Sequence, residues 1–177
     1  MENYLGLSPV EAFTSICTYP HHKRGAIRLF GLLPERVRNV LNKNFVHVTD
    51  IFDKSLDPNS PIEGETLAFF KEGGRAIYLT PKTIFSEEGF MGLLAHEIAH
   101  TYVYHSPKIV RFFSRKYYSL KFRNLPYGIR RMYFSYPPEK QAEEYHADAL
   151  VRKWGFKEFQ NKLWTEMSYR SNKNYTY

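Results

Sequence analysis

The chain has little cysteine and no long apolar run. Its single cysteine, Cys17, excludes a disulfide within the chain and suits a reducing compartment. The longest apolar stretches are far shorter than the roughly 18 residues that a membrane-spanning helix needs. Residues 1–20 carry Glu2 and Glu11 and show no basic segment before an apolar run, so we expect no signal peptide. These absences together predict a cytoplasmic protein without a transmembrane segment.

What the chain does contain predicts a folded protein. Hydrophobic residues make up 43% of the 177 residues and aromatic residues 17%, which is unlike a disordered chain. We expect one domain over residues 1–177, with an α+β fold in which a small β-sheet packs on helices. Turn and periodicity signals predict helices starting at Ser8-Pro9 and over Arg24–Leu33, Glu35–Asn42 and Lys157–Tyr169, with a strand at Phe45–Val48.

The most informative residues are His96-Glu97-Ile98-Ala99-His100, an H-E-x-x-H motif. Two histidines four apart on a helix lie on one face, at the spacing that lets both bind one zinc ion. Glu97 between them is then placed to act as a general base. Ser86 is a favourable N-cap for this helix, and the apolar residues that follow it have helical spacing. The small Gly89 and Gly92 allow another element to approach closely.

A catalytic zinc site requires a third protein ligand and leaves one position open. The metzincin pattern is excluded because Val103 and Ser106 stand where it needs glycine and histidine. Glu144 can ligate zinc, and Asp148, one helical turn later, can accept the spare ring N–H of a zinc-bound histidine. The competing residues His105, Glu143 and His146 point away from the ligand face at helical spacing, which leaves Glu144 as the predicted third ligand.

These two motifs carry a resemblance to a known family. H-E-x-x-H followed by Glu144-Tyr145-His146-Ala147-Asp148 resembles the gluzincin metallopeptidases, closest to the M48-like branch and the small minigluzincins. The resemblance covers roughly residues 66–105, a hairpin and the H-E-x-x-H helix, and 138–154, the third-ligand helix. It implies a zincin-like domain that binds Zn2+ and hydrolyses peptide bonds as an endopeptidase. The resemblance also implies the role of each residue. The metal ligands would be His96, His100 and Glu144, the catalytic base would be Glu97, and Asp148 would orient a ligand histidine.

The segment before the motif helix predicts a β-hairpin. Two β-rich runs, 66–70 and 75–80, flank the turn residues Gly73-Gly74. In gluzincins the strand preceding the motif helix is an exposed edge that binds extended peptide, and this hairpin occupies the corresponding place.

Several features of the site stay open from the sequence. The donor that stabilises the oxyanion has five candidates: Tyr133, Tyr136, Tyr145, His146 and Arg152. Two alternative functions also remain: a latent enzyme inhibited by its tail Asn174–Tyr177, and a nucleic-acid- or partner-binding module with a structural zinc site.

Residues 106–137 form an insert that the family resemblance does not cover. Between Ser106 and Tyr136 lie eight lysines and arginines and no acidic residue, interleaved with nine aromatics. Ile109, Phe112, Phe113, Tyr117 and Leu120 follow helical spacing, which predicts an amphipathic helix with basic flanks. Three interpretations compete: a basic face over a packed aromatic stripe, a contact with nucleic acid, and a contact with an anionic membrane surface or acidic partner.

Overall fold

The computed structural model describes residues 6–50, 68–70, 75–79 and 85–173. The helices are α1 Pro9–Phe13, α2 Pro20–Leu32, α3 Glu35–Lys43, α4 Glu87–His105, α5 Lys108–Arg123, α6 Tyr127–Arg130, α7 Pro138–Lys153 and α8 Lys157–Lys173, with a 3-10 turn, η3, at Arg131–Tyr133. The strands are β1 His47–Thr49, β2 Ala68–Phe70 and β3 Ala76–Leu79. The expected combination of helices with a small sheet is therefore confirmed at this coarse level. The loop 57–61 and the tail 174–177 lie outside the described residues.

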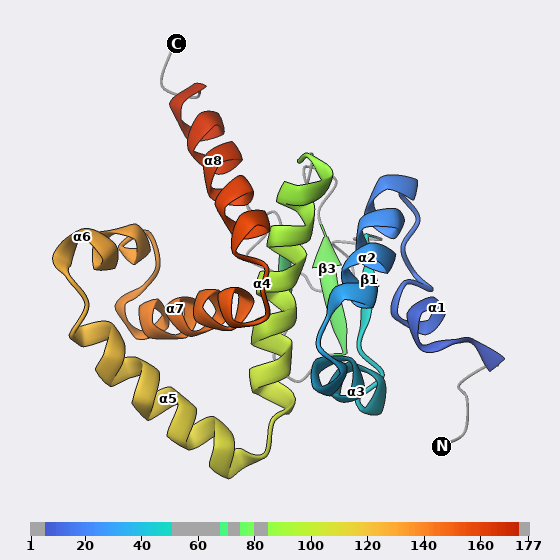
Figure 1. The fold of residues 1–177 in the computed structure, drawn as a ribbon, viewed down its shortest axis with the longest axis horizontal. Coiled ribbons are helices and arrows are strands. Elements are labelled where there is room, and N and C mark those ends of the chain that lie inside the picture. The colour runs from blue at the N-terminus through green and yellow to red at the C-terminus, as the bar shows by residue number, and fades with distance from the viewer. Residues whose placement is uncertain (1–5, 51–67, 71–74, 80–84, 174–177) are drawn as a thin grey trace, which may run out of the picture.

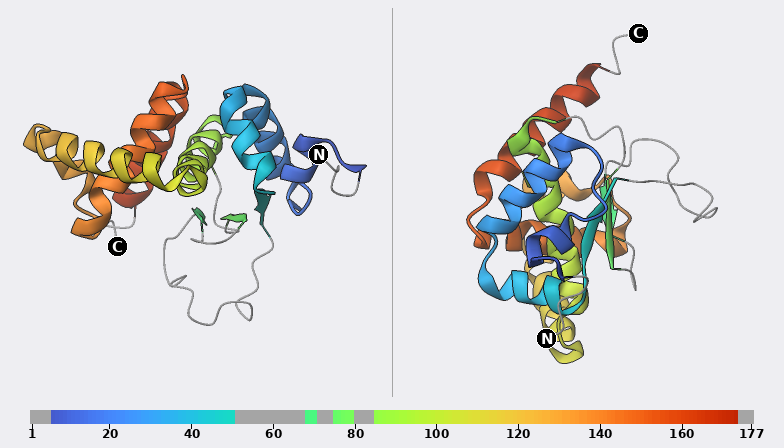
Figure 2. Two further views of the ribbon diagram at one scale, coloured as in Figure 1. Left: turned by 90° about the horizontal axis from the view of Figure 1, so that it is seen from below. Right: turned by 90° about the vertical axis from the view of Figure 1, so that its right-hand side faces the viewer.

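The long helix α4 occupies the centre of the fold. Figure 1 shows α7 and α8 on one side of α4 and α2 on the other, and all three pack against it. The strands lie together on one side of this helical layer, as the right-hand view of Figure 2 shows. The apolar core is continuous around α4, where Met91, Leu94 and Ile98 are completely buried. The buried residues of α4 are thus held between the elements that pack on its two sides.

The three strands form a mixed sheet with the order β1-β3-β2. β2 and β3 pair antiparallel, which confirms the two strands of the predicted hairpin, while its turn at 71–74 lies outside the described residues. β1 pairs parallel to β3, so the strand preceding α4 is central, and the expectation that it forms an edge is wrong. Within the described residues, β2 is the edge of the hairpin, and it packs beside α4.

The predicted strand at Phe45–Val48 begins two residues later, and the end of α3 explains why. Phe45 adopts a left-handed conformation with φ 54°. The Phe45 amide donates to Asn42, and the Val46 amide donates to Leu41 at 2.9 Å. This is the pattern of a Schellman C-cap, in which one residue must leave the right-handed region. Strand pairing therefore starts only at His47.

A buried carboxylate joins β1 to the start of α2. Asp50 accepts hydrogen bonds from the Thr18 amide and hydroxyl, the Tyr19 amide and the Cys17 thiol. Burial raises the pKa of Asp50, but the bonds from Thr18 and Tyr19 outweigh it and lower the pKa to about 2. His22 contacts the same carboxylate and stacks on Phe90 of α4. This polar cluster fixes the N-terminal helices against α4.

The N-terminal half of α4 is fastened to α8. The predicted N-cap Ser86 accepts from the Gly89 amide, and both its amide and its hydroxyl donate to Glu166 of α8. At Gly92 an added Cβ would collide with the backbone carbonyl of Phe159, so the two helices cross here in direct backbone contact. The prediction that the glycines of this helix allow close approach is confirmed. The last helix also extends beyond the predicted Tyr169, to Lys173.

The insert forms α5, α6 and η3, and α5 is the predicted amphipathic helix. Its apolar stripe is not packed, however: Ile109, Phe112, Phe113, Tyr117 and Leu120 are all more than half exposed. The residues that do pack, Phe122 and Tyr118, lie on the opposite side of α5, against α7. The interpretation of a packed aromatic stripe is therefore wrong for these residues. Among the described residues no helix combines the length and apolar character needed to cross a membrane.

We predict that Gly92→Ala destabilises the protein by about 1–3 kcal/mol, because the new methyl group would force α4 and α8 apart. The free energy of unfolding from urea titrations measures this. Gly31→Ala in α2 is the matched control, since no atom lies within 4 Å of a Cβ there. The control should be neutral or slightly stabilising. Equal unfolding midpoints for Gly92→Ala and wild type would contradict the close helix crossing.

Candidate metal site

Helices α4 and α7 bring the predicted ligands together. α4 carries His96 and His100 one turn apart, with Glu97 next to His96, and α7 packs against it with Glu144 and Asp148. One donor atom each from His96, His100 and Glu144 lies within 4.8 Å of the other two. The pair His96 and Glu144 is separated by 48 residues in the chain, so the fold creates this cluster. Within the described part of the chain, no other group of three His, Cys, Asp or Glu side chains is close enough together to hold a metal ion.

The distances between the three donor atoms fit a small tetrahedral cation. His96 Nε2 lies 3.0 Å from Glu144 Oε2 and 3.1 Å from His100 Nε2. His100 Nε2 lies 3.5 Å from Glu144 Oε2. Zinc bonds of about 2.0–2.1 Å give a tetrahedron with edges of about 3.3 Å. Two imidazoles and one carboxylate are also a donor set that catalytic zinc uses, so the residues fit this ion.

Asp148 fixes the orientation of the first histidine. His96 Nδ1 lies 2.9 Å from Asp148 Oδ1, and since a carboxylate only accepts, Nδ1 carries the proton. The Nε2 lone pair then points at Glu144 Oε2, which also carries lone pairs. Two such atoms at this distance need a proton or a metal ion between them. The predicted orienting role of Asp148 has the geometry it requires.

Tyr133 supports Asp148 from the insert, a role that sequence reasoning missed. Its hydroxyl donates to Asp148 Oδ2 at 2.7 Å, and its ring is fully buried against Phe122 and Tyr145. Burial, with Asp148 beside it, raises the pKa of Tyr133, so the hydroxyl stays protonated and donates. Tyr133 lies on a short 3-10 turn, where no helical spacing relates it to α7. In the sequence, Tyr133 stood out only as one of the five candidate oxyanion donors.

The electrostatics of the cluster favour a positive charge at its centre. Burial opposes charge on His96, but the bonds to Asp148 and Glu144 outweigh it and raise the pKa of His96 well above its usual value. Burial likewise raises the pKa of Glu144, yet bonds from His100 and His96 lower it far below the usual range. Both shifts show that the carboxylates around His96 stabilise a positive charge there, so the site attracts a cation.

The competing ligands lie elsewhere, as predicted. His146 stacks on Tyr118 at 3.8 Å between ring centroids, and burial, with His100 and Arg115 nearby, lowers its pKa to about 4. Glu143 forms an ion pair with Arg115 at 3.0 Å. His105 is part of no group that could hold a metal ion among the described residues.

Of the five candidate oxyanion donors, Tyr136 has the most suitable surroundings. Tyr133 is occupied by Asp148, and Arg152 donates to Gln160 at 2.8 Å. Tyr145 is buried in the aromatic cluster with Phe122 and Tyr133, whereas Tyr136 packs against this cluster and is only partly buried. His146 stacks on Tyr118. Burial, and after it the nearby carboxylates of Glu144, Asp148 and Glu97, raises the pKa of Tyr136.

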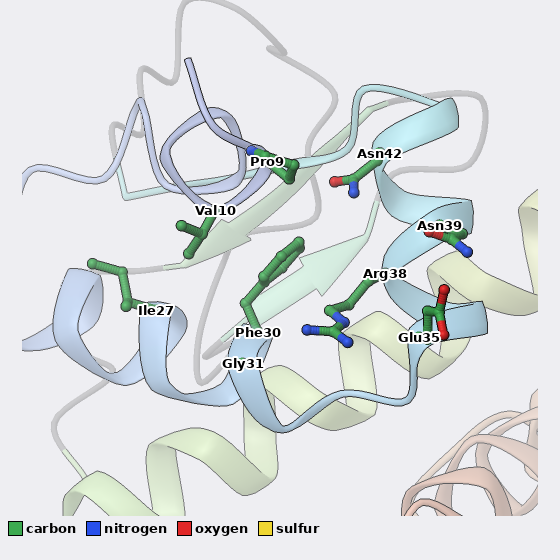
Figure 3. A pocket seen from close by; sticks show the side chains of 9 residues that line it. All are labelled: Pro9, Val10, Ile27, Phe30, Gly31, Glu35, Arg38, Asn39 and Asn42. Atoms are coloured by element: carbon green, nitrogen blue, oxygen red, sulfur yellow. The ribbon is translucent and has the colours of Figure 1, made fainter. Parts of the chain in front are cut away.

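The ligand side chains remain partly open to solvent. His96 is 12% exposed, His100 25% and Glu144 14%, whereas Glu97 is buried. A separate surface pocket of about 540 Å³ lies between α1, α2 and α3. Figure 3 shows Phe30 in the middle of this pocket, with Val10 and Arg38 beside it. None of its lining residues belongs to the metal group, so the two sites are distinct.

We predict that Tyr133→Phe lowers zinc affinity about 10- to 100-fold, because it removes a hydrogen bond that holds Asp148 against His96. Competition against a chelator of known affinity measures this. Tyr117→Phe on the exposed side of α5 is the matched control and should bind zinc as wild type does. Circular dichroism verifies that both variants keep their helices. Unchanged affinity in Tyr133→Phe would show that Asp148 needs no such support.

Comparisons with known proteins do not add to this geometry. The chain matches no protein-family model, no curated protein and no solved structure.

Proposed function

We propose that this chain is a zinc-dependent endopeptidase of the gluzincin type, with a zincin-like domain. The observation that carries the proposal is the convergence of one donor atom each from His96, His100 and Glu144, at distances that suit a zinc ion, with Asp148 bonded to His96. Two further observations support it. Glu97 is buried beside the ligands, and the ligand side chains are partly exposed, as a site that admits substrate requires.

Each residue then has a defined task. His96, His100 and Glu144 would hold the zinc ion, which when bound supplies a Lewis acid and lowers the pKa of water toward 7. Glu97 accepts a proton from the attacking water and returns it to the leaving amine. Its burial reduces competition from bulk solvent and strengthens its interactions with charged groups nearby. Asp148 keeps the His96 ring in one tautomer throughout.

The hydroxyl of Tyr136 is the donor proposed to stabilise the oxyanion. Burial raises the pKa of Tyr136, so its hydroxyl stays protonated near neutral pH and is able to donate. The backbone at this residue is fixed, because the Tyr136 carbonyl accepts from the Gln141 side chain at 3.0 Å at the start of α7. A donor held in place beforehand stabilises developing charge with little reorganisation.

The substrate would bind as an extended strand along β2. This strand forms the edge of the hairpin and packs beside α4, the helix that carries two ligands and the base. Backbone pairing with an edge strand gives affinity with little dependence on sequence. We therefore infer a preference for extended or unfolded segments, with a specificity that depends weakly on the side chains of the substrate.

We predict that Glu97→Gln reduces peptide hydrolysis by about 10²- to 10⁴-fold while zinc content stays unchanged, because the amide cannot accept the proton. Mass spectrometry of a mixed peptide library, together with metal analysis, measures both quantities. Glu143→Gln removes a carboxylate on the same helix as Glu144, in a half-exposed ion pair, and serves as the control. If Glu97→Gln cleaved as well as wild type, the proposed mechanism would be wrong.

We predict that Tyr136→Phe lowers kcat about 10- to 10³-fold with KM and zinc content nearly unchanged, because the lost hydroxyl acts only when charge develops. Steady-state kinetics on the best library peptide separates the two constants. Tyr127→Phe, an exposed tyrosine of α6, is the control and should leave both unchanged. A rise in KM with constant kcat would instead assign Tyr136 to substrate binding.

A further inference from the structure

The outer face of α5 is an apolar surface with nothing packed on it in the described structure. Ile109 is 66% exposed, and Phe113 and Leu120 are each 62% exposed. At about 100° per residue these three lie within about 40° of one another on the helix. Figure 1 shows α5 at the edge of the molecule, and it packs on α7 through the opposite side. Apolar residues grouped in this way mark an interaction site.

Basic residues border this apolar face on both sides. At helical spacing Lys121 lies on one side, and Lys108 and Arg123 lie on the other. Lys116 stands at the edge of the apolar face, with its ammonium 4.5 Å from the centre of the Phe112 ring. The whole segment from Ser106 to Tyr136 contains no acidic residue. The face is therefore complementary to a surface that is both negatively charged and apolar.

We propose that α5 docks this protein on a membrane surface that contains anionic phospholipid. Helices that lie in the interface of a bilayer insert Phe, Leu and Ile between the lipids and place Lys and Arg among the headgroups. α5 has this arrangement, and its apolar residues are already exposed, so docking needs no change in the fold. The structure also places α5 directly against α7, which carries Glu144.

Two other occupants fit the same face less well. Nucleic acid would use the cations and stack on aromatic rings, but Ile109 and Leu120 offer no ring to a base. A second copy of this chain would place the same cations opposite one another across a two-fold axis, with no acidic residue in the segment to offset them. A lipid surface uses both the charges and the aliphatic side chains.

Co-sedimentation of the full chain with phospholipid vesicles tests the proposal. The protein should sediment with vesicles containing about one third phosphatidylserine and stay in solution with phosphatidylcholine alone. Raising the salt concentration from about 0.1 M to 1 M should weaken binding, because exposed charges are screened. The variant carrying Ile109→Ser, Phe113→Ser and Leu120→Ser should bind at least about tenfold more weakly. These side chains are exposed, so the variant should fold.

Two control variants separate this surface from other effects. Ile27→Ser removes an exposed apolar side chain from α2 and should bind vesicles as wild type does. Glu97→Gln should also bind as wild type, since docking does not depend on the proposed hydrolysis. Equal sedimentation of wild type with both vesicle types, or full binding by the triple variant, would overturn the proposal. Salt-sensitive binding to single-stranded RNA, or a dimer that the triple variant dissociates, would overturn it if vesicle binding were absent.

Discussion

The hydrogen bond from His96 to Asp148 is the contact on which the candidate site depends. It joins the two helices that carry all the ligands, and it fixes which nitrogen of His96 faces Glu144. Bonds of this kind to a charged group contribute about 1.5–3 kcal/mol, enough to hold a ring in one tautomer. The other oxygen of Asp148 is held by Tyr133, so the carboxylate cannot rotate without losing both partners. The geometry around His96 is thus set before any ion binds.

The insert joins this site to the outer surface of the molecule. On its inner side, Phe122 packs on Tyr133 and Tyr118 stacks on His146 of α7. On its outer side, α5 exposes Phe113 and its neighbours to solvent. The proposed docking would give these two faces a reason for the unusual composition, because the aromatics would then serve both packing and docking while the cations stay at the surface. Its lack of acidic residues is an asymmetry that packing alone does not require.

The sequence predicted those parts of the site that follow from spacing along one helix. His96 and His100 share a face of α4, and Glu144 and Asp148 share a face of α7, because residues four apart lie one turn from each other. Tyr133 could not be predicted in this way, since its contact with Asp148 depends on how a 3-10 turn folds back on α7. Of the three interpretations of the α5 stripe, the packed one is wrong, because periodicity shows that a helix has an apolar face without showing what covers it. The strand was predicted to include Phe45 because this residue favours strands. Its left-handed conformation is set instead by the end of α3, which local propensity does not reveal.

Metal analysis of the purified protein tests the central claim most directly. Plasma mass spectrometry on wild type, Glu144→Ala and the control Glu143→Ala compares the predicted third ligand with its neighbour on the same helix. We expect about one zinc ion per chain in wild type and in Glu143→Ala, and little or none in Glu144→Ala. Wild-type protein that holds no zinc after incubation with it, or a Glu144→Ala variant that keeps a full equivalent, would contradict the three-ligand site.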